Sequence, residues 1–246
     1  MSLRVTFLGA GDAFSSGGRC MAAYLVQATE ATFLLDCGAT TLLALKRQQL
    51  NADDLDAVVI SHLHGDHFAG LPFLFLEYLY NRKRTRPLLI AGPPGTQERV
   101  QEVYRAMYRE LSTRPIPFPI VYREMEPERD EEIAGCRVHP FRVPHQETEI
   151  SLGLRIQAGG KTILYSGDSG WTEKFVEQSR GTDLFICECC YFDTRVDFHL
   201  DYPRIAEQRV HFGCKRLVLT HIGQEVLDRL GEVKEEVARD GLVVEV

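Results

Sequence analysis

A dense group of potential metal ligands lies between residues 61 and 67, where the sequence reads SHLHGDH. Neutral imidazoles and carboxylates are the donors that zinc and similar divalent ions prefer. An isolated His-x-His would more often belong to a surface loop or to a single structural zinc. The longer pattern His-x-His-x-Asp-His instead predicts a catalytic centre with two divalent metal ions, zinc or manganese, held in this segment by His62, His64, Asp66 and His67.

The elements around this motif are expected to place it at the end of a strand. The apolar run AVVI at residues 57–60 predicts a buried strand, and a helix is predicted from His67 to Tyr80. The ligands then fall on a loop and on the first helical turn, where irregular backbone lets the first two histidines face one ion while Asp66 and His67 face the other. Gly65 is expected to allow a tight reversal between the two pairs.

Four other predicted strands also end in groups that can bind a metal ion. They cover residues 32–35, 136–143, 161–165 and 217–220, and the groups that follow them are Asp36, His145, Asp168 and His221. Because binding groups gather at the carboxyl-terminal edge of the sheet in layered α/β folds, we expect these residues to converge. This regularity favours one shared site over four unrelated core residues.

The order of these groups suggests a role for each. His145 is the expected third ligand of the ion bound by His62 and His64. Asp168 is expected to bridge both ions, because one carboxylate has two oxygens and its charge offsets the repulsion between the cations. His221 is expected to complete the ligand set of the second ion.

The composition indicates a chain with a sizeable core and little affinity for extended polyanions. One domain over residues 1–246 is expected, because the length does not force a second. The net charge of −7 and the isoelectric point near 5.7 argue against extended nucleic-acid binding. Since no apolar run approaches the roughly 18 residues of a membrane-spanning helix, no association with a membrane is expected.

Seven cysteines, an odd number, favour a reducing compartment, and we expect a cytoplasmic protein. Cys187, Cys189 and Cys190 come close to a metal-like cluster. The first two belong to an apolar run in which cysteine acts as a small buried hydrophobe, so we favour a structural role.

A glycine-rich loop at residues 9–19 follows the first predicted strand. It lacks the third glycine of a dinucleotide fingerprint and leads into another strand, not into a helix. The loop is either a rim of the active site, with Ser15, Ser16 and Arg19 available to an anionic substrate, or a plain connection.

The ligand pattern resembles that of the metallo-β-lactamase fold superfamily, and the series from GAGD at residues 9–12 through His221 resembles its ribonuclease Z-like branch. The resemblance implies an α/β fold, a four-layer αββα sandwich of two mixed sheets flanked by helices. It also implies a hydrolase in which a hydroxide shared by two metal ions attacks the substrate, with Asp168 orienting it. Asp36, in the context LLDCG, is then expected to support the metal site through hydrogen bonds.

Full-length tRNA-processing members of this branch carry a long arm between the third histidine and the bridging aspartate. Only 22 residues separate His145 from Asp168 here, and a predicted hairpin accounts for them. The chain therefore looks most similar to compact phosphodiesterases without the arm, which implies a small phosphodiester substrate, cyclic or nucleotide-like. His199 matches a histidine that points at the substrate in those proteins, with a plain helix-entry residue as the alternative. Asp66, Asp168 and His199 are the expected catalytic groups.

Other activities share parts of this pattern. A thioester or lactone hydrolase of the glyoxalase II or lactonase type has the same central motif, and a mononuclear iron oxygenase can be built on the same fold. A tRNA 3′-processing endonuclease is disfavoured by the missing arm. Dimers are common among similar proteins, so a homodimer stays an open alternative.

Overall fold

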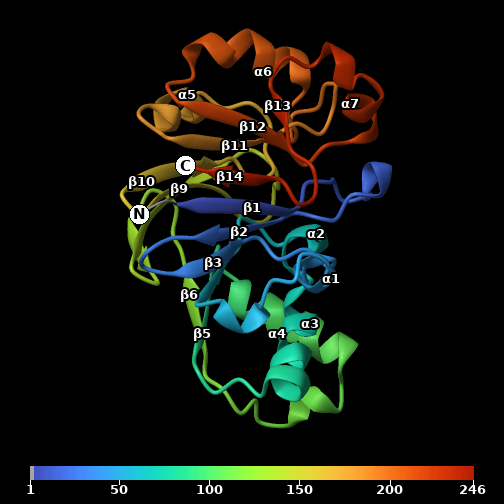
Figure 1. The fold of residues 1–246 in the computed structure, drawn as a ribbon, viewed down its shortest axis with the longest axis vertical. Coiled ribbons are helices and arrows are strands. Elements are labelled where there is room, and N and C mark those ends of the chain that lie inside the picture. Colours follow the sequence, from blue (N-terminus) through green and yellow to red (C-terminus); the bar gives the residue numbers. More distant parts are fainter. Residues whose placement is uncertain (1–2) are drawn as a thin grey trace.

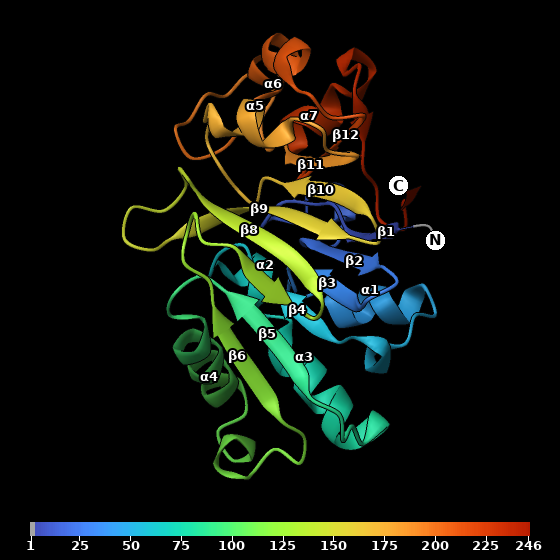
Figure 2. The same cartoon turned by 90° about the vertical axis from the view of Figure 1, so that its left-hand side faces the viewer.

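The computed structural model describes residues 3–246, which form two seven-stranded sheets packed face to face. Helices cover the outer face of each sheet, as Figure 1 shows. Turned by 90°, Figure 2 shows α3 (Leu71–Leu76) and α4 (Thr96–Met107) at one end of the molecule, with α5 (Lys174–Ser179) and α6 (Tyr202–Gln208) at the other. This arrangement confirms the four-layer αββα sandwich expected from the sequence.

The first sheet has the order β14-β1-β2-β3-β4-β5-β6. Strands β14, β1, β2 and β3 pair antiparallel, and β3 to β6 pair parallel. The strands are β1 (Arg4–Gly9), β2 (Ala23–Gln27), β3 (Thr32–Leu35), β4 (Ala57–Val59), β5 (Leu88–Gly92), β6 (Ile120–Glu124) and β14 (Val243–Glu245).

The second sheet has the order β13-β12-β11-β10-β9-β8-β7 and is likewise part antiparallel and part parallel. Strands β7 to β10 pair antiparallel, and β10 to β13 pair parallel. The strands are β7 (Glu131–Ile133), β8 (Cys136–Val143), β9 (Ser151–Ala158), β10 (Lys161–Tyr165), β11 (Leu184–Glu188), β12 (Arg216–Thr220) and β13 (Glu236–Val237).

The remaining helices on the first sheet are α1 (Thr41–Arg47) and α2 (Gly65–Phe68), and the second sheet also carries α7 (Gln224–Asp228). Among residues 3–246, no helix has the length and apolar character needed to cross a membrane.

Burial on both faces explains the continuous apolar strands that the sequence shows. In β4, Ala57 and Val59 join the core between the two sheets, whereas Val58 packs into the core between the first sheet and its helices. Successive side chains of a strand point to opposite faces, so both faces of a doubly covered strand must be apolar. The run that ends at residue 60 therefore anchors the following ligand segment between two cores.

The helix expected from His67 to Tyr80 is interrupted, because the chain passes very close to a neighbouring loop at Gly70. Helix α2 ends at Phe68, α3 begins at Leu71, and a π-helical turn (Glu77–Arg82) follows. The Gly70 N–H donates to the Cys37 carbonyl over 2.8 Å, and a β-carbon at Gly70 would collide with the carbonyl oxygens of Cys37 and Gly38. Glycine is thus required at the break.

One other expectation is wrong. Gly65 does not have a positive φ, and it begins α2 without needing the freedom of glycine. The acidic segment 124–132, whose composition is typical of a solvated turn, includes the start of β7, because residues 131–133 pair with β8. Pairing with a partner strand outweighs the local preference of this charged segment.

Replacing Gly70 by alanine is expected to lower the free energy of unfolding by about 1–3 kcal/mol, because the added methyl group meets backbone atoms that cannot rotate away. Gly65→Ala is the matched control, since its β-carbon would make only an ordinary contact of 3.9 Å with Ala69. That variant should lose no stability, because alanine favours a helix. Urea denaturation measures both, and equal stability of the two variants would contradict the close approach at Gly70.

Candidate metal centre

The structure brings all seven predicted ligand side chains together in two adjacent groups. Within each group the potential ligand atoms lie within 4.8 Å of one another. The first group consists of His62, His64 and His145, and the second consists of Asp66, His67, Asp168 and His221. These side chains come from segments that follow β4, β8, β10 and β12. Their convergence is what the strand-end pattern predicts, and their role as ligands stays a prediction.

The first group is formed by three imidazole rings in edge-to-face contact. The Nε2 atom of His145 lies 3.0 Å from Nδ1 of His64, and the ring centroid of His62 lies 4.8 Å from that of His64 and 4.7 Å from that of His145. His62 is fully buried, whereas the other two rings are partly exposed. One side of this group is therefore open to solvent.

The second group is organised by the Asp168 carboxylate, which lies between the two groups. Its Oδ2 atom is 3.2 Å from His67 Nε2, 3.3 Å from His221 Nε2 and 3.8 Å from His62 Nε2. Asp66 Oδ2 adds a second carboxylate oxygen, 3.2 Å from His67 Nε2. A bridging role for Asp168 is compatible with this position.

Several of these polar atoms are buried and have no hydrogen-bond partner. They include His62 Nε2, Asp168 Oδ1 and His221 Nδ1. Leaving a buried polar group unpaired costs roughly 1–3 kcal/mol, so native proteins rarely tolerate a cluster of them. Divalent cations bind such imidazole and carboxylate donors at close range, and the residues present fit a metal centre.

The protonation states also suit metal binding. Burial, together with the nearby His67, lowers the pKa of His62 well below its ordinary value, and burial lowers the pKa of His145 to about 4. Burial alone would raise the pKa of Asp168, but His221 and His67 hold it well below the usual range. His62 and His145 are thus neutral and Asp168 is ionised, the forms that coordinate metal.

His67 of the second group differs from these rings, because the groups around it favour its protonated form. Burial alone would lower the pKa of His67, but the carboxylates of Asp168, Asp66 and Asp36 raise it well above its ordinary value. Three acidic groups around one ring make this a place where positive charge is favoured. A bound cation would supply that charge without the proton.

Asp36 supports the site from behind, as the resemblance implied. Its Oδ2 atom accepts hydrogen bonds from the Ser61 hydroxyl at 2.8 Å and the Tyr165 hydroxyl at 2.6 Å, and lies 2.7 Å from His67 Nδ1. Its Oδ1 atom accepts the Ser61 N–H at 2.7 Å. Such contacts fix the orientation of a ligand ring and leave the Nε2 atom of His67 facing Asp168.

His199 lies beside both groups and is held by Glu188, a residue that the sequence analysis missed. Its ring centroid is 4.9 Å from that of His145, and the ring stacks on His221 at 5.5 Å. His199 Nδ1 is 2.8 Å from Glu188 Oε1. Burial alone would lower the pKa of His199, but Glu188 raises it to about 9. An imidazolium therefore faces the two groups.

The signal for Glu188 was present in the sequence. It is the last residue of the apolar strand β11, and five of the residues discussed above come shortly after the ends of strands. Its carboxylate is fully buried and also accepts the N–H groups of Ser169 at 2.7 Å and Cys190 at 3.2 Å. The cysteines on either side of Glu188 indicate packing, and this signal masks the acid between them.

Cys187 in this strand and the two cysteines after it, Cys189 and Cys190, are buried free thiols, as expected of small core residues. Burial raises the pKa of Cys187 and Cys189 well above the ordinary value, so both stay protonated. Cys190 differs because its sulfur lies within 4.8 Å of ring nitrogens of His199 and His221. Burial also raises the pKa of Cys190, so its thiol stays protonated beside those rings.

The glycine-rich loop at 9–19 does not present Ser16 and Arg19 as free side chains, contrary to one of the two alternatives. The Ser16 hydroxyl donates to Asp12 Oδ2 over 2.7 Å, and Asp12 Oδ1 accepts the Ser16 N–H at 2.9 Å. Arg19 donates to the carbonyl of Ala238. Ser16 therefore closes the loop on itself, and Arg19 links it to the C-terminal segment.

Known proteins resemble this chain over most of its length. The family described as anti-Pycsar protein Apyc1 has a model that matches residues 3–236. A ribonuclease Z from Agathobacter rectalis is 30% identical over 278 aligned positions, which cover 92% of this chain and 89% of that protein. Because the alignment is longer than the 246 residues of this chain, the relative contains segments that this chain lacks.

Two solved structures share the fold over almost all of the chain. YhfI from Bacillus subtilis, a metallo-beta-lactamase fold protein, superposes with a TM-score of 0.79 at 23% identity and covers 100% of both chains. The short form of human tRNase Z (ELAC1) superposes with a TM-score of 0.78 at 28% identity and covers 98% of both chains. This chain is a metallohydrolase of the metallo-β-lactamase fold and belongs to the family described as anti-Pycsar protein Apyc1.

Proposed function

We propose that the protein is a phosphodiesterase that hydrolyses a small phosphodiester, cyclic or nucleotide-like, with two divalent metal ions. The observation that carries this proposal is the position of His199, which the buried Glu188 holds beside the two groups at 2.8 Å from Nδ1 and whose pKa it raises. A phosphodiester is an anion, and a fixed positive charge attracts it and its developing charge. A neutral thioester or lactone gains less from such a charge.

The residues of the two groups would have distinct roles in binding the metal ions and orienting the water molecule. When bound, two divalent ions would polarise a phosphoryl oxygen and lower the pKa of a water molecule. His62, His64 and His145 are the proposed ligands of one ion. The second ion would be held by the second group, namely Asp66, His67, Asp168 and His221. Asp168 would in addition lie between the ions and orient the attacking water.

His199 is proposed to act on the substrate and not on the metal. Because its pKa is raised to about 9, its ring carries a proton at neutral pH. It can donate a hydrogen bond to a phosphoryl oxygen and pass the proton to the leaving alkoxide, while Glu188 keeps the ring oriented through Nδ1. The free Nε2 atom is then the donating atom.

The short connection between His145 and Asp168 supports a small substrate. Residues 151–158 and 161–165 form the hairpin β9–β10, which accounts for most of the connection, and no arm extends from it. The net charge of −7 also disfavours a long polyanionic substrate. These features favour a nucleotide-sized phosphodiester over tRNA.

Parallel assays of the metal-loaded protein test this proposal. Bis-p-nitrophenyl phosphate should be hydrolysed, and S-lactoylglutathione should not. Turnover of the thioester alone would contradict the phosphodiesterase proposal. Oxygen consumption with one iron per chain would instead indicate an oxygenase.

Replacing Asp168 by alanine is expected to lower metal content and phosphodiesterase activity together, the activity by more than about 100-fold, because the carboxylate between the cations is lost. Asp168→Asn removes the charge with little change in volume and should behave in the same way. Elemental analysis and the phosphodiester assay measure the two quantities. The exposed Asp228, replaced by alanine, is the control and should change neither. Two tightly bound metal ions in Asp168→Ala would contradict its bridging role.

Replacing His199 by alanine should leave the metal content unchanged and lower kcat by about 100- to 10,000-fold, the usual range for the loss of a general acid. His211→Ala removes an exposed imidazole outside both groups and serves as the control. The assay is paired with elemental analysis of each variant. Should His199→Ala lose metal, His199 would be a ligand and not a proton donor.

Glu188→Gln tests the ion pair through the pH dependence of kcat. Glu188 raises the pKa of His199, so protonated His199 and the activity that needs it are present below this pKa and are lost as pH rises through it. Without the negative charge, this alkaline loss should move to lower pH, while the metal content stays unchanged. An alkaline limb at the same pH in the variant and the parent would exclude His199 as its source.

A further inference from the structure

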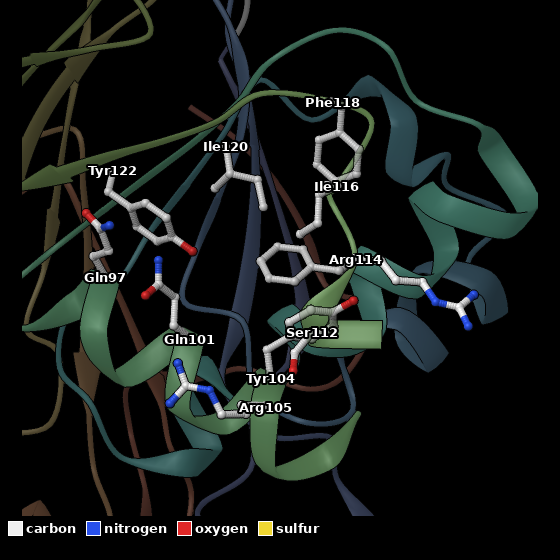
Figure 3. A pocket seen from close by; sticks show the side chains of 11 residues that line it. Gln97, Gln101, Tyr104, Arg105, Ser112, Arg114, Ile116, Phe118, Ile120 and Tyr122 are labelled. Carbon is white, nitrogen blue, oxygen red and sulfur yellow. The ribbon is translucent and has the colours of Figure 1, made fainter. Parts of the chain in front are cut away.

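A cavity of about 470 Å³ lies between helix α4, strand β6 and the segment before that strand. Figure 3 shows it from close by. None of the proposed metal ligands lines it, so it is separate from the metal centre. Its volume falls within the range of pockets that hold small molecules, roughly 300–1,000 Å³.

Helix α4 contributes a row of polar side chains to one side of this cavity. Gln97, Gln101 and Arg105 are spaced by four residues, which places them along one face of the helix. Among residues 3–246, none of these three side chains has a hydrogen-bond or ion-pair partner. Figure 3 shows the three along the same side of the cavity.

Two tyrosines add hydroxyl groups that are also unpaired. The Tyr104 side chain is only 6% exposed, and its hydroxyl is buried without a hydrogen-bond partner. The Tyr122 hydroxyl points into the cavity in Figure 3 and has no partner within the described part of the chain. Burial raises the pKa of Tyr104 and raises that of Tyr122 to about 12, so both groups are donors at neutral pH. The unpaired buried hydroxyl of Tyr104 indicates a missing partner.

The floor of the cavity is apolar, and the charged side chains that line the cavity are positive. Phe118 is buried, and Ile116 and Ile120 lie beside it. Within residues 3–246, Arg105 and Arg114 are the charged side chains that line the cavity. Arg114 donates to Glu110 and points away from the cavity in Figure 3, so Arg105 remains as the uncommitted cation.

We propose that this cavity is a binding site for a small planar anion, namely a heteroaromatic ring that carries one negatively charged group. The ring would pack on Phe118 and its aliphatic neighbours, with its polar atoms facing the amides of α4 and the two tyrosine hydroxyls. Arg105 would pair with the charged group. Neither the proposed reaction nor its metal ions take part in this binding.

Indole-3-carboxylate and its neutral counterpart indole-3-carboxamide are suitable probes for the full-length, metal-loaded protein. Saturation-transfer NMR detects binding, and titration calorimetry gives the affinities. Arg105→Gln should weaken binding of the carboxylate about fivefold, the loss expected for one partly exposed ion pair, and leave binding of the amide unchanged. Tyr104→Phe should weaken both probes, because the indole N–H loses the Tyr104 hydroxyl oxygen as its acceptor.

Arg109→Gln is the matched control, since it removes the same charge from an exposed residue that does not line the cavity. It should change neither affinity. Equal effects of Arg105→Gln and Arg109→Gln, or an absence of saturable binding at millimolar probe concentrations, would overturn the proposal.

Gln101→Trp fills the cavity from an exposed position and should abolish binding of both probes while the protein stays folded. Circular dichroism and light scattering accompany this variant. Should it leave binding intact but change the oligomeric state, the cavity would be a contact between copies of the chain, and the proposed ligand site would be wrong.

Discussion

A buried carboxylate surrounded by imidazoles is the constraint on which this structure depends. Asp168 is 2% exposed, and its Oδ2 atom lies 3.2–3.8 Å from ring nitrogens of His67, His221 and His62. An isolated buried charge costs several kcal/mol, and only closely placed partners offset that cost. The segments that carry these rings must therefore converge to within a few tenths of an ångström. The same arrangement gathers negative charge and donor atoms where cations could bind. Folding and the proposed catalysis therefore depend on the same geometry.

The parallel half of each sheet brings these segments together. Strands β3 and β4 in one sheet, and β10, β11 and β12 in the other, point the same way as their parallel neighbours and deliver their last residues to one edge. Asp36 and His221 follow such strands with φ values of 57° and 52°, a left-handed conformation that costs energy for residues other than glycine. The hydrogen bonds of Asp36 and the contact of His221 with Asp168 offset this strain.

The strand ends and the residues that gather at the site were predictable because both follow from local sequence. An apolar β-branched run predicts a strand, and a histidine or aspartate just after it lies at the sheet edge, as at His145 and Asp168. Features that depend on distant partners were not predictable. The break at Gly70 arises from the approach of Cys37, and β7 forms because β8 lies beside it. Glu188 was missed for another reason, since its signal was local but masked by the cysteines around it.

Glu188 and His199 pair beside the two groups, with the His199 ring in contact with His145 and His221. The role proposed for this ring requires that the two groups hold cations, and anomalous X-ray scattering from crystals grown with zinc or manganese tests this most directly. We expect two anomalous peaks, one among His62, His64 and His145 and one among Asp66, His67, Asp168 and His221. A single peak, or peaks away from these side chains, would contradict the account.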